Sequence, residues 1–163
     1  MKTVQLLLEG WDASYEKEAW YPPLRDALNG LTAEQAAWRP EGSVLNSIWE
    51  NVNHLIFYRE QLLKQWTGEE TDYPAGVTND DTFAVESRTE KAWQETLARL
   101  DAVHNGIRSL LAAATEEELE RRIPGKPLDA WLYNLLVHDA YHTGAIIQLR
   151  KLQGSWPARR SFE

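Results

Sequence analysis

The sequence predicts an all-α protein, a four-helix bundle with short extra helical turns in the connections. Four long stretches carry apolar residues at alternating steps of three and four, the spacing of one face of an α-helix. Almost no stretch alternates apolar and polar residues as a half-buried strand would. Proline, glycine and helix-capping residues separate the long stretches. Helices with one apolar side bury that side against one another, so a bundle is expected.

The first long helix is expected over residues 3–20, because Val4, Leu7, Leu8, Trp11 and Tyr15 fall on one side of it. Two prolines, at 22 and 23, then interrupt the helix. The stretch "LRDALNG" predicts a short helical piece, and "AEQAAW" predicts one further turn that begins with a capping box.

The second long helix is expected over about residues 44–66, opened by Ser43 or Asn46 and stopped at Gly68. The following stretch, "TGEETDYPAGVTNDD", has no periodicity and predicts a polar loop, which could fold over one end of the bundle. The third long helix is expected over about 86–114. The residues expected to face the core on it are Trp93, Leu97, Leu100, His104, Ile107, Leu111.

After the third helix, Thr115 and Glu118 have the spacing of a second capping box and predict another short turn. The fourth long helix is expected to begin near Pro127, a residue suited to the first helical position, and to end at Gly154. No internal repeat or low-complexity tract interrupts this order. With 163 residues, the chain is expected to form one domain, residues 1–163.

The net charge of the chain argues against two classes of binding partner. The formal net charge is −8, and basic residues adjoin one another only in pairs, such as Arg159 with Arg160 near the end of the chain. A nucleic-acid or anionic-membrane surface needs clustered Lys and Arg, so neither partner is expected. No stretch reads as a signal peptide or a membrane span, and the chain has no cysteine. We therefore expect a cytoplasmic protein without disulfides or thiolate catalysis of its own.

Two histidines stand within the buried row of the fourth helix. In "LYNLLVHDAYHTGAIIQLRKL", His138 and His142 are four residues apart and lie on one face, one turn from each other. The row that contains them is Leu128, Trp131, Leu135, His138, His142, Ala145, Leu149, Leu152. A buried imidazole needs a partner for each ring nitrogen. The pair therefore indicates either a shared metal ion or two core histidines bonded to neighbouring polar groups.

The chain has only two other histidines. His54, on the second helix, borders a polar row that could line a cavity, and Glu50 one turn earlier could orient its imidazole. His104, on the third helix, has only Asn105 and Arg108 near it to make a site. We interpret His104 as a structural histidine and His54 as the third candidate ligand, with His138 and His142.

Three neutral imidazoles bind a divalent first-row metal and leave coordination positions open, as in catalytic sites. Zinc and nickel come first, with iron, cobalt and copper as alternatives. The pair lacks the glutamate of the zinc-peptidase pattern "HExxH", and the helices lack the glutamates of di-iron bundles. Peptide hydrolysis and di-iron chemistry are therefore not supported.

The combination of "NSIWENVNHLIFYREQL" on the second helix and "LVHDAYHTGAIIQLRKLQG" on the fourth resembles the DinB-like superfamily of four-helix-bundle metalloproteins. The resemblance extends through "EKEAWYPPLRDALNGLTAEQAAWRP" and so covers most of the chain. It implies a three-histidine metal site formed by His54, His138 and His142. Many members have "HRGQ" or "HAGQ" after the last ligand, whereas this chain has "HTGA", with Ala145 in place of the glutamine.

Characterised members of that family resemble thiol transferases: some join low-molecular-weight thiols such as bacillithiol or mycothiol to electrophiles, and a related branch isomerises maleylpyruvate with a thiol. The leading hypothesis is therefore a metal-dependent enzyme that transfers a small thiol to an electrophile. Asn51, Tyr58 and Asp139 are candidates for the polar lining of the site or for groups that orient its ligands.

Three other functions remain open at this point. A hydrolase that uses metal-bound water would share every ligand, and a bundle that binds metal or a small hydrophobic ligand would do no chemistry. An interaction module without metal is the last alternative. Apolar residues left over on the first and fourth helices, together with the family resemblance, predict a homodimer. The sequence identifies neither the native metal, nor the substrate, nor a catalytic acid or base.

Overall fold

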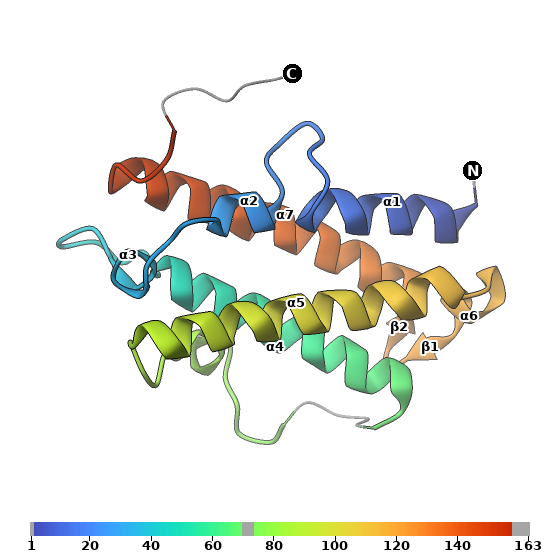
Figure 1. Cartoon of the computed structure of the whole chain (residues 1–163). Helices are drawn as coiled ribbons and strands as arrows, with labels where there is room; N and C mark the ends of the chain where they lie inside the picture. The colour runs from blue at the N-terminus through green and yellow to red at the C-terminus, as the bar shows by residue number, and fades with distance from the viewer. Residues whose placement is uncertain (1, 70–73, 158–163) are drawn as a thin grey trace.

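The computed structural model describes residues 2–69 and 74–157, and its architecture is the predicted bundle (Figure 1). The long helices are α1 (Thr3–Tyr15), α4 (Ile48–Thr67), α5 (Glu90–Ala113) and α7 (Leu128–Leu152). The connections hold α2 (Leu24–Leu28), α3 (Ala33–Ala37), the 3-10 helix η1 (Asp80–Phe83), α6 (Glu116–Glu120), β1 (Arg122–Ile123) and β2 (Lys126–Pro127). The last two form a minimal antiparallel pair, so the all-α class with short helical turns is confirmed.

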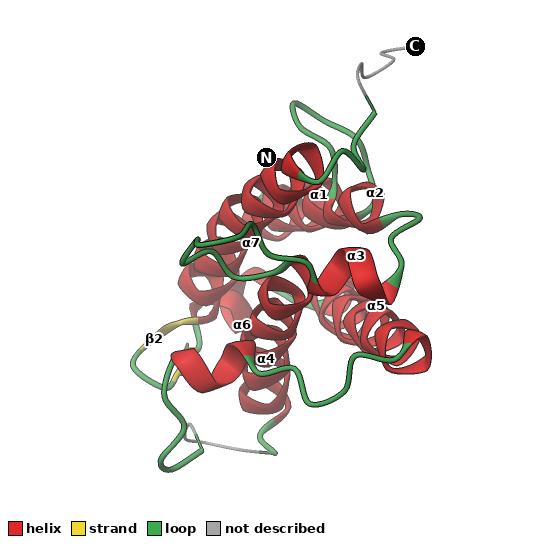
Figure 2. Ribbon diagram, turned by 90° about the vertical axis from the view of Figure 1, so that its left-hand side faces the viewer, coloured by secondary structure: helices red, strands yellow, loops and turns green. Residues whose placement is uncertain are grey.

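The four long helices form a closed ring of contacts. Both α1 and α4 pack against α5 and α7, so α1 and α4 lie diagonally opposite each other (Figure 2). Figure 1 also shows that α4 and α5 run in one direction and α1 and α7 in the other. The chain that leaves α4 must therefore return along the bundle before α5 begins. This return brings η1 against α4.

Buried tryptophans form part of the core between the helices. Trp11, Trp49 and Trp93 are buried almost completely, and each indole N–H finds an acceptor. The acceptors are the carbonyl oxygen of His104 at 3.2 Å for Trp11, the Thr96 hydroxyl at 3.1 Å for Trp49, and the carbonyl oxygen of Leu31 at 2.9 Å for Trp93. A buried indole without such an acceptor would lose its hydrogen bond to water. These hydrogen bonds join each indole to a neighbouring segment, so the tryptophans position the helices relative to one another as well as filling the core.

Three predicted helix boundaries were wrong by several residues. The helix α1 ends at Tyr15 rather than 20, where the N–H groups of Glu16 and Lys17 both close on the carbonyl oxygen of Asp12. The helix α4 begins at Ile48 rather than 44, because the capping residue is Ser47, whose hydroxyl accepts from the Glu50 N–H. Likewise, Thr89 caps α5, which begins at Glu90 rather than 86.

The remaining boundaries follow the sequence more closely. The helix α7 spans Leu128–Leu152 against a predicted span from Pro127 to Gly154, and Pro127 precedes the first turn as its capping residue. Among the described residues, no helix is long and apolar enough to cross a membrane. The basic pair Arg159 and Arg160 lies outside the described residues.

Candidate metal centre

Three histidines from two helices come together where the first half of α4 lies beside the middle of α7. His54 comes from α4, and His138 and His142 come from successive turns of α7. Their ligand nitrogens all lie within 4.8 Å of one another. The Nε2 atoms of His54 and His138 are 3.0 Å apart. His54 and His142 are buried and His138 is half-buried, so the three residues predicted as ligands form one cluster, here called the histidine triad.

A threonine fixes which nitrogen of His54 faces the triad. The Thr82 hydroxyl donates to the carbonyl oxygen of Asn79 at 2.6 Å, so its oxygen is left to accept a hydrogen bond. It lies 2.6 Å from Nδ1 of His54, which must therefore be the protonated nitrogen. The lone pair of His54 is consequently on Nε2 and points toward His138.

An asparagine does the same for His142. The side-chain N–H₂ of Asn51 donates to the carbonyl oxygen of Ser47 at 2.8 Å, which fixes the orientation of the amide. The amide oxygen of Asn51 then accepts from Nδ1 of His142 at 2.7 Å. His142 therefore also presents an unprotonated Nε2, the arrangement that second-shell hydrogen bonds produce at metal sites.

The electrostatics of the triad keep its imidazoles neutral. Burial, followed by the neighbouring His142 and His138, lowers the pKa of His54 from 6.5 to about 3. Burial and the neighbouring His138 lower the pKa of His142 to about 4. Burial also lowers the pKa of His138. Neutral imidazole is the form that binds a metal, so all three side chains are ready to act as ligands at neutral pH.

The segment that carries Thr82 was not identified as part of the site from the sequence. The sequence predicted a polar loop after α4 that could fold over one end of the bundle, and in the structure η1 of this connection lies against α4 beside His54. The Phe83 ring stacks on the imidazole of His54, with ring centroids 4.0 Å apart and planes inclined by 12°. The signal available in the sequence was an apolar Phe83 in a polar stretch, which on its own does not indicate a site.

Two clefts meet at the triad. The larger has a volume of about 430 Å³ and is bordered by His54 and His142, with Asn51, Phe83, Ala145 and Gln148 in its wall. The smaller has a volume of about 300 Å³ and is bordered by His54 and His138. Its other walls are Tyr58, Asn79, Trp131, Asn134 and Leu135. Ligands can therefore approach the three imidazoles from two sides.

The other polar candidates have separate roles. Asn51 orients His142, as described above, and the Tyr58 hydroxyl donates to the side-chain oxygen of Asn79 at 2.9 Å in the wall of the smaller cleft. Asp139 lines neither cleft: it is fully buried and pairs with Arg59 of α4 at 2.6 Å. The interpretation that Glu50 orients His54 was wrong, because the Glu50 carboxylate bonds to the backbone N–H of Ser47 and to Arg39.

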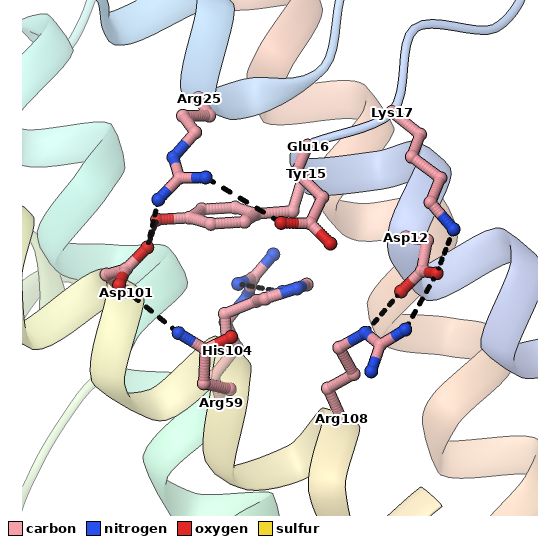
Figure 3. A network of polar contacts seen from close by, with 10 residues as sticks. Asp12, Tyr15, Glu16, Lys17, Arg25, Arg59, Asp101, His104 and Arg108 are labelled. Carbon is pink, nitrogen blue, oxygen red and sulfur yellow. Dashed lines mark hydrogen bonds and ion pairs between the residues drawn. The ribbon is translucent and has the colours of Figure 1, made fainter. Parts of the chain in front are cut away.

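The fourth histidine lies apart from the triad, as predicted. His104 is fully buried, and its ring stacks on Trp11 and on Tyr15 at centroid distances of 5.3 and 4.0 Å. Figure 3 shows it between two groups of polar residues, Tyr15, Arg25 and Asp101 on one side and Asp12 with Arg108 on the other. Its Nδ1 faces the guanidinium of Arg59 at 3.4 Å. His104 is thus a structural residue of the core.

The donor set of the triad fits a divalent transition-metal ion. Two of the three imidazoles have their Nδ1 protons fixed on acceptors, and all three are neutral. Among the described residues, no carboxylate lines either cleft. Asp139, which follows His138 in the sequence, is already paired with Arg59. The positive charge of a bound ion would therefore lack a counter-charge from these residues, which favours an anionic ligand at its open positions.

Comparison with known proteins gives one finding that bears on this site. Residues 19–146 match the family model described as DinB superfamily. This range contains all three histidines of the triad together with Thr82 and Asn51. No curated protein and no solved structure matches the chain.

Proposed function

Because the chain belongs to the DinB superfamily, we propose that it is a metal-dependent enzyme that transfers a low-molecular-weight thiol to an electrophile. In this proposal His54, His138 and His142 hold one divalent ion, with zinc or nickel as the first candidates. The observation that carries the proposal is the charge of the site: three neutral imidazoles beside open clefts and no carboxylate among the described lining residues.

A divalent ion in the triad would lower the pKa of a thiol that coordinates it, and the thiolate is the reactive form of sulfur. The protein supplies no cysteine for such chemistry, so the thiol is a substrate. Thr82 and Asn51 hold the Nδ1 protons of His54 and His142, and this leaves both Nε2 atoms unprotonated and able to coordinate one ion. The two clefts, together with the half-buried His138, leave the triad accessible to a thiol.

A hydrolase is supported less well by the same residues. Many metal-dependent hydrolases use a carboxylate near the metal as a general base. The described residues of both clefts include neither Asp nor Glu. A thiol that loses its proton more readily than water does needs no such base.

The test is a thiol-consumption assay with a generic electrophile, run on metal-loaded protein and on the His138→Ala variant. We expect loss of thiol that depends on metal and that is at least about tenfold slower with the variant. Hydrolysis of esters without any dependence on thiol would support the hydrolase instead. Loss of metal that only lowers the melting temperature, with no turnover of thiol, would indicate a non-catalytic metal-binding bundle.

A further inference from the structure

The two clefts differ in the chemistry of their walls, although both end at the triad. The larger one carries the amide side chains of Asn46, Asn79 and Gln148 beside apolar residues such as Phe83 and Leu149. The smaller one is mainly aromatic and aliphatic, with Tyr58, Trp131 and Leu135. Of the described lining residues, the two clefts have His54 and Asn79 in common.

The described part of the chain contributes no charged side chain to either cleft. Of the described residues that form the two walls, none is Asp, Glu, Lys or Arg. Away from the atom that coordinates the ion, a carboxylate or ammonium group of a ligand would leave water without gaining an ion pair with any described wall residue, which is unfavourable. Amide groups, in contrast, both donate and accept hydrogen bonds. The side chains of Asn46 and Gln148 make no hydrogen bond to other described residues, so both are available to a ligand.

Asn79 lies in the walls of both clefts. The Tyr58 hydroxyl donates to the Asn79 side chain at 2.9 Å, and the backbone oxygen of Asn79 accepts from the Thr82 hydroxyl at 2.6 Å. Asn79 is thereby held between the two openings. His142 borders the larger cleft, His138 the smaller one, and His54 borders both.

From this geometry, and resting on the function proposed above, we propose that the two clefts hold the two reactants separately. The larger cleft takes an uncharged thiol that carries hydroxyl or amide groups, and the smaller cleft takes an uncharged, apolar or aromatic electrophile. The thiol sulfur and the electrophilic carbon meet at the triad. There the thiol loses its proton to solvent, the sulfur–carbon bond forms, and the leaving group departs with the electron pair of its bond to that carbon.

The test uses cobalt-substituted protein, in which a sulfur ligand produces a charge-transfer absorption band that is independent of turnover. Three small thiols that differ in charge are titrated: 1-thioglycerol, 3-mercaptopropionate and 2-aminoethanethiol. After correction for the thiolate fraction of each, we expect 1-thioglycerol to bind at least about tenfold more tightly than either charged thiol.

Two matched variants assign the clefts. Gln148 and Asn134 are both exposed amides of α7, one in each cleft, so replacement by arginine is compatible with the fold at both positions. We expect Gln148→Arg to tighten binding of 3-mercaptopropionate by about fivefold or more. Asn134→Arg should leave all three thiol affinities within about twofold, and raise KM for 1-chloro-2,4-dinitrobenzene by about fivefold.

The outcomes separate this inference from the function on which it rests. Equal affinity for all three thiols, or a change of thiol preference in Asn134→Arg and not in Gln148→Arg, would overturn the assignment of the clefts and leave thiol transfer intact. No sulfur band with any thiol, in protein that has bound cobalt, would overturn thiol transfer itself.

Discussion

At the scale of single residues, two hydrogen bonds decide whether the triad can act as a metal site. The imidazoles of His54 and His142 each donate from Nδ1, to Thr82 and to Asn51, so each directs an unprotonated Nε2 inward. Rotation of either ring, or the other tautomer, would point a proton at the ion instead. Among the described residues, Nδ1 of His138 has no hydrogen-bond partner, so no neighbouring side chain fixes its tautomer from that nitrogen.

Replacement of Thr82 by valine keeps the shape of the side chain and removes the acceptor for His54. We expect the affinity for zinc or nickel to fall by about 10- to 100-fold, because the ring of His54 loses the bond that fixes its tautomer. Competition with a chromophoric chelator measures this change. Thr82→Ser should retain most of the affinity, since it keeps the hydroxyl.

The matched control for this variant is Thr78→Val, in the same segment. The Thr78 hydroxyl bonds to Asp81 and touches no histidine of the triad, so its loss should leave metal affinity unchanged. Equal affinity of Thr82→Val and the unmodified protein would contradict the role given to Thr82.

His104 makes the stability of the protein depend on pH. Its pKa is lowered from 6.5 to about 3, first by burial and then by Arg59, Arg108 and Arg25, while Asp12 acts in the opposite direction. As the pH falls, His104 therefore binds a proton near pH 6.5 in the unfolded chain, but only near pH 3 in the folded chain. This stabilisation is present above pH 6.5 and is lost as the pH falls through that window.

Between pH 7 and pH 5 the contribution of His104 amounts to about 2 kcal/mol. We expect the free energy of unfolding of the metal-free protein to fall by that much more in the unmodified chain than in His104→Phe, which keeps the stacking on Trp11 and Tyr15. Urea unfolding at the two pH values measures the difference. Parallel pH dependence of both proteins would refute it.

At the scale of the elements, α4 and α7 are held in register by one buried ion pair. Arg59 and Asp139 are both fully buried, 2.6 Å apart, and the guanidinium also lies over the rings of Trp11 and Tyr15. Asp139 directly follows His138, and Arg59 stands five residues after His54. The pair therefore fixes the two ligand-bearing helices close to the triad.

Arg59→Met would leave the Asp139 carboxylate buried without its partner, and we expect a loss of about 3–5 kcal/mol in the free energy of unfolding. The double variant Arg59→Met with Asp139→Leu should recover much of that loss, because no unpaired charge remains. The control is Arg99→Met: Arg99 pairs with Glu60 between α5 and α4 but is 60% exposed, so the cost should stay below about 1 kcal/mol. A small loss in Arg59→Met would contradict a structural role for the pair.

Helical periodicity explains which parts of the site were predictable. A spacing of four on one helix identifies His138 and His142 as neighbours, and a polar row identifies His54, because both properties are local. The contact of Thr82 with His54 depends on the direction of the chain between two helices, which periodicity does not report. The same limit applies to Glu50. Its spacing allows a contact with His54, but its carboxylate instead bonds to Arg39 and within the capping box of α4.

At the scale of the whole molecule, α4 and α5 run in the same direction, so the connection between them must pass back along the bundle (Figure 1). This connection carries η1. The sequence predicted the number of long helices and not this order in space, because the helix-breaking residues mark where a helix ends and not where the next one packs. The site is thus completed by a connection rather than by a fifth helix.

We expect the protein to form a homodimer through exposed apolar residues of α7 and α1. Tyr133 and Val137 on α7 are 62% and 53% exposed, and Leu6 on α1 is 59% exposed. Apolar side chains grouped on neighbouring helices favour association with a second copy. Light scattering at micromolar concentration should give about twice the chain mass of 18.7 kDa. A monomeric mass, or no effect of Val137→Glu on a dimeric one, would contradict this surface.

The most direct test of the metal centre is the metal content of untagged protein, measured by inductively coupled plasma mass spectrometry beside alanine variants of all four histidines. The account predicts about one ion per chain in the unmodified protein and in His104→Ala, and loss of that ion in His54→Ala, His138→Ala and His142→Ala. Unmodified protein that binds no metal even after loading, or a triad variant that keeps its ion, would contradict it.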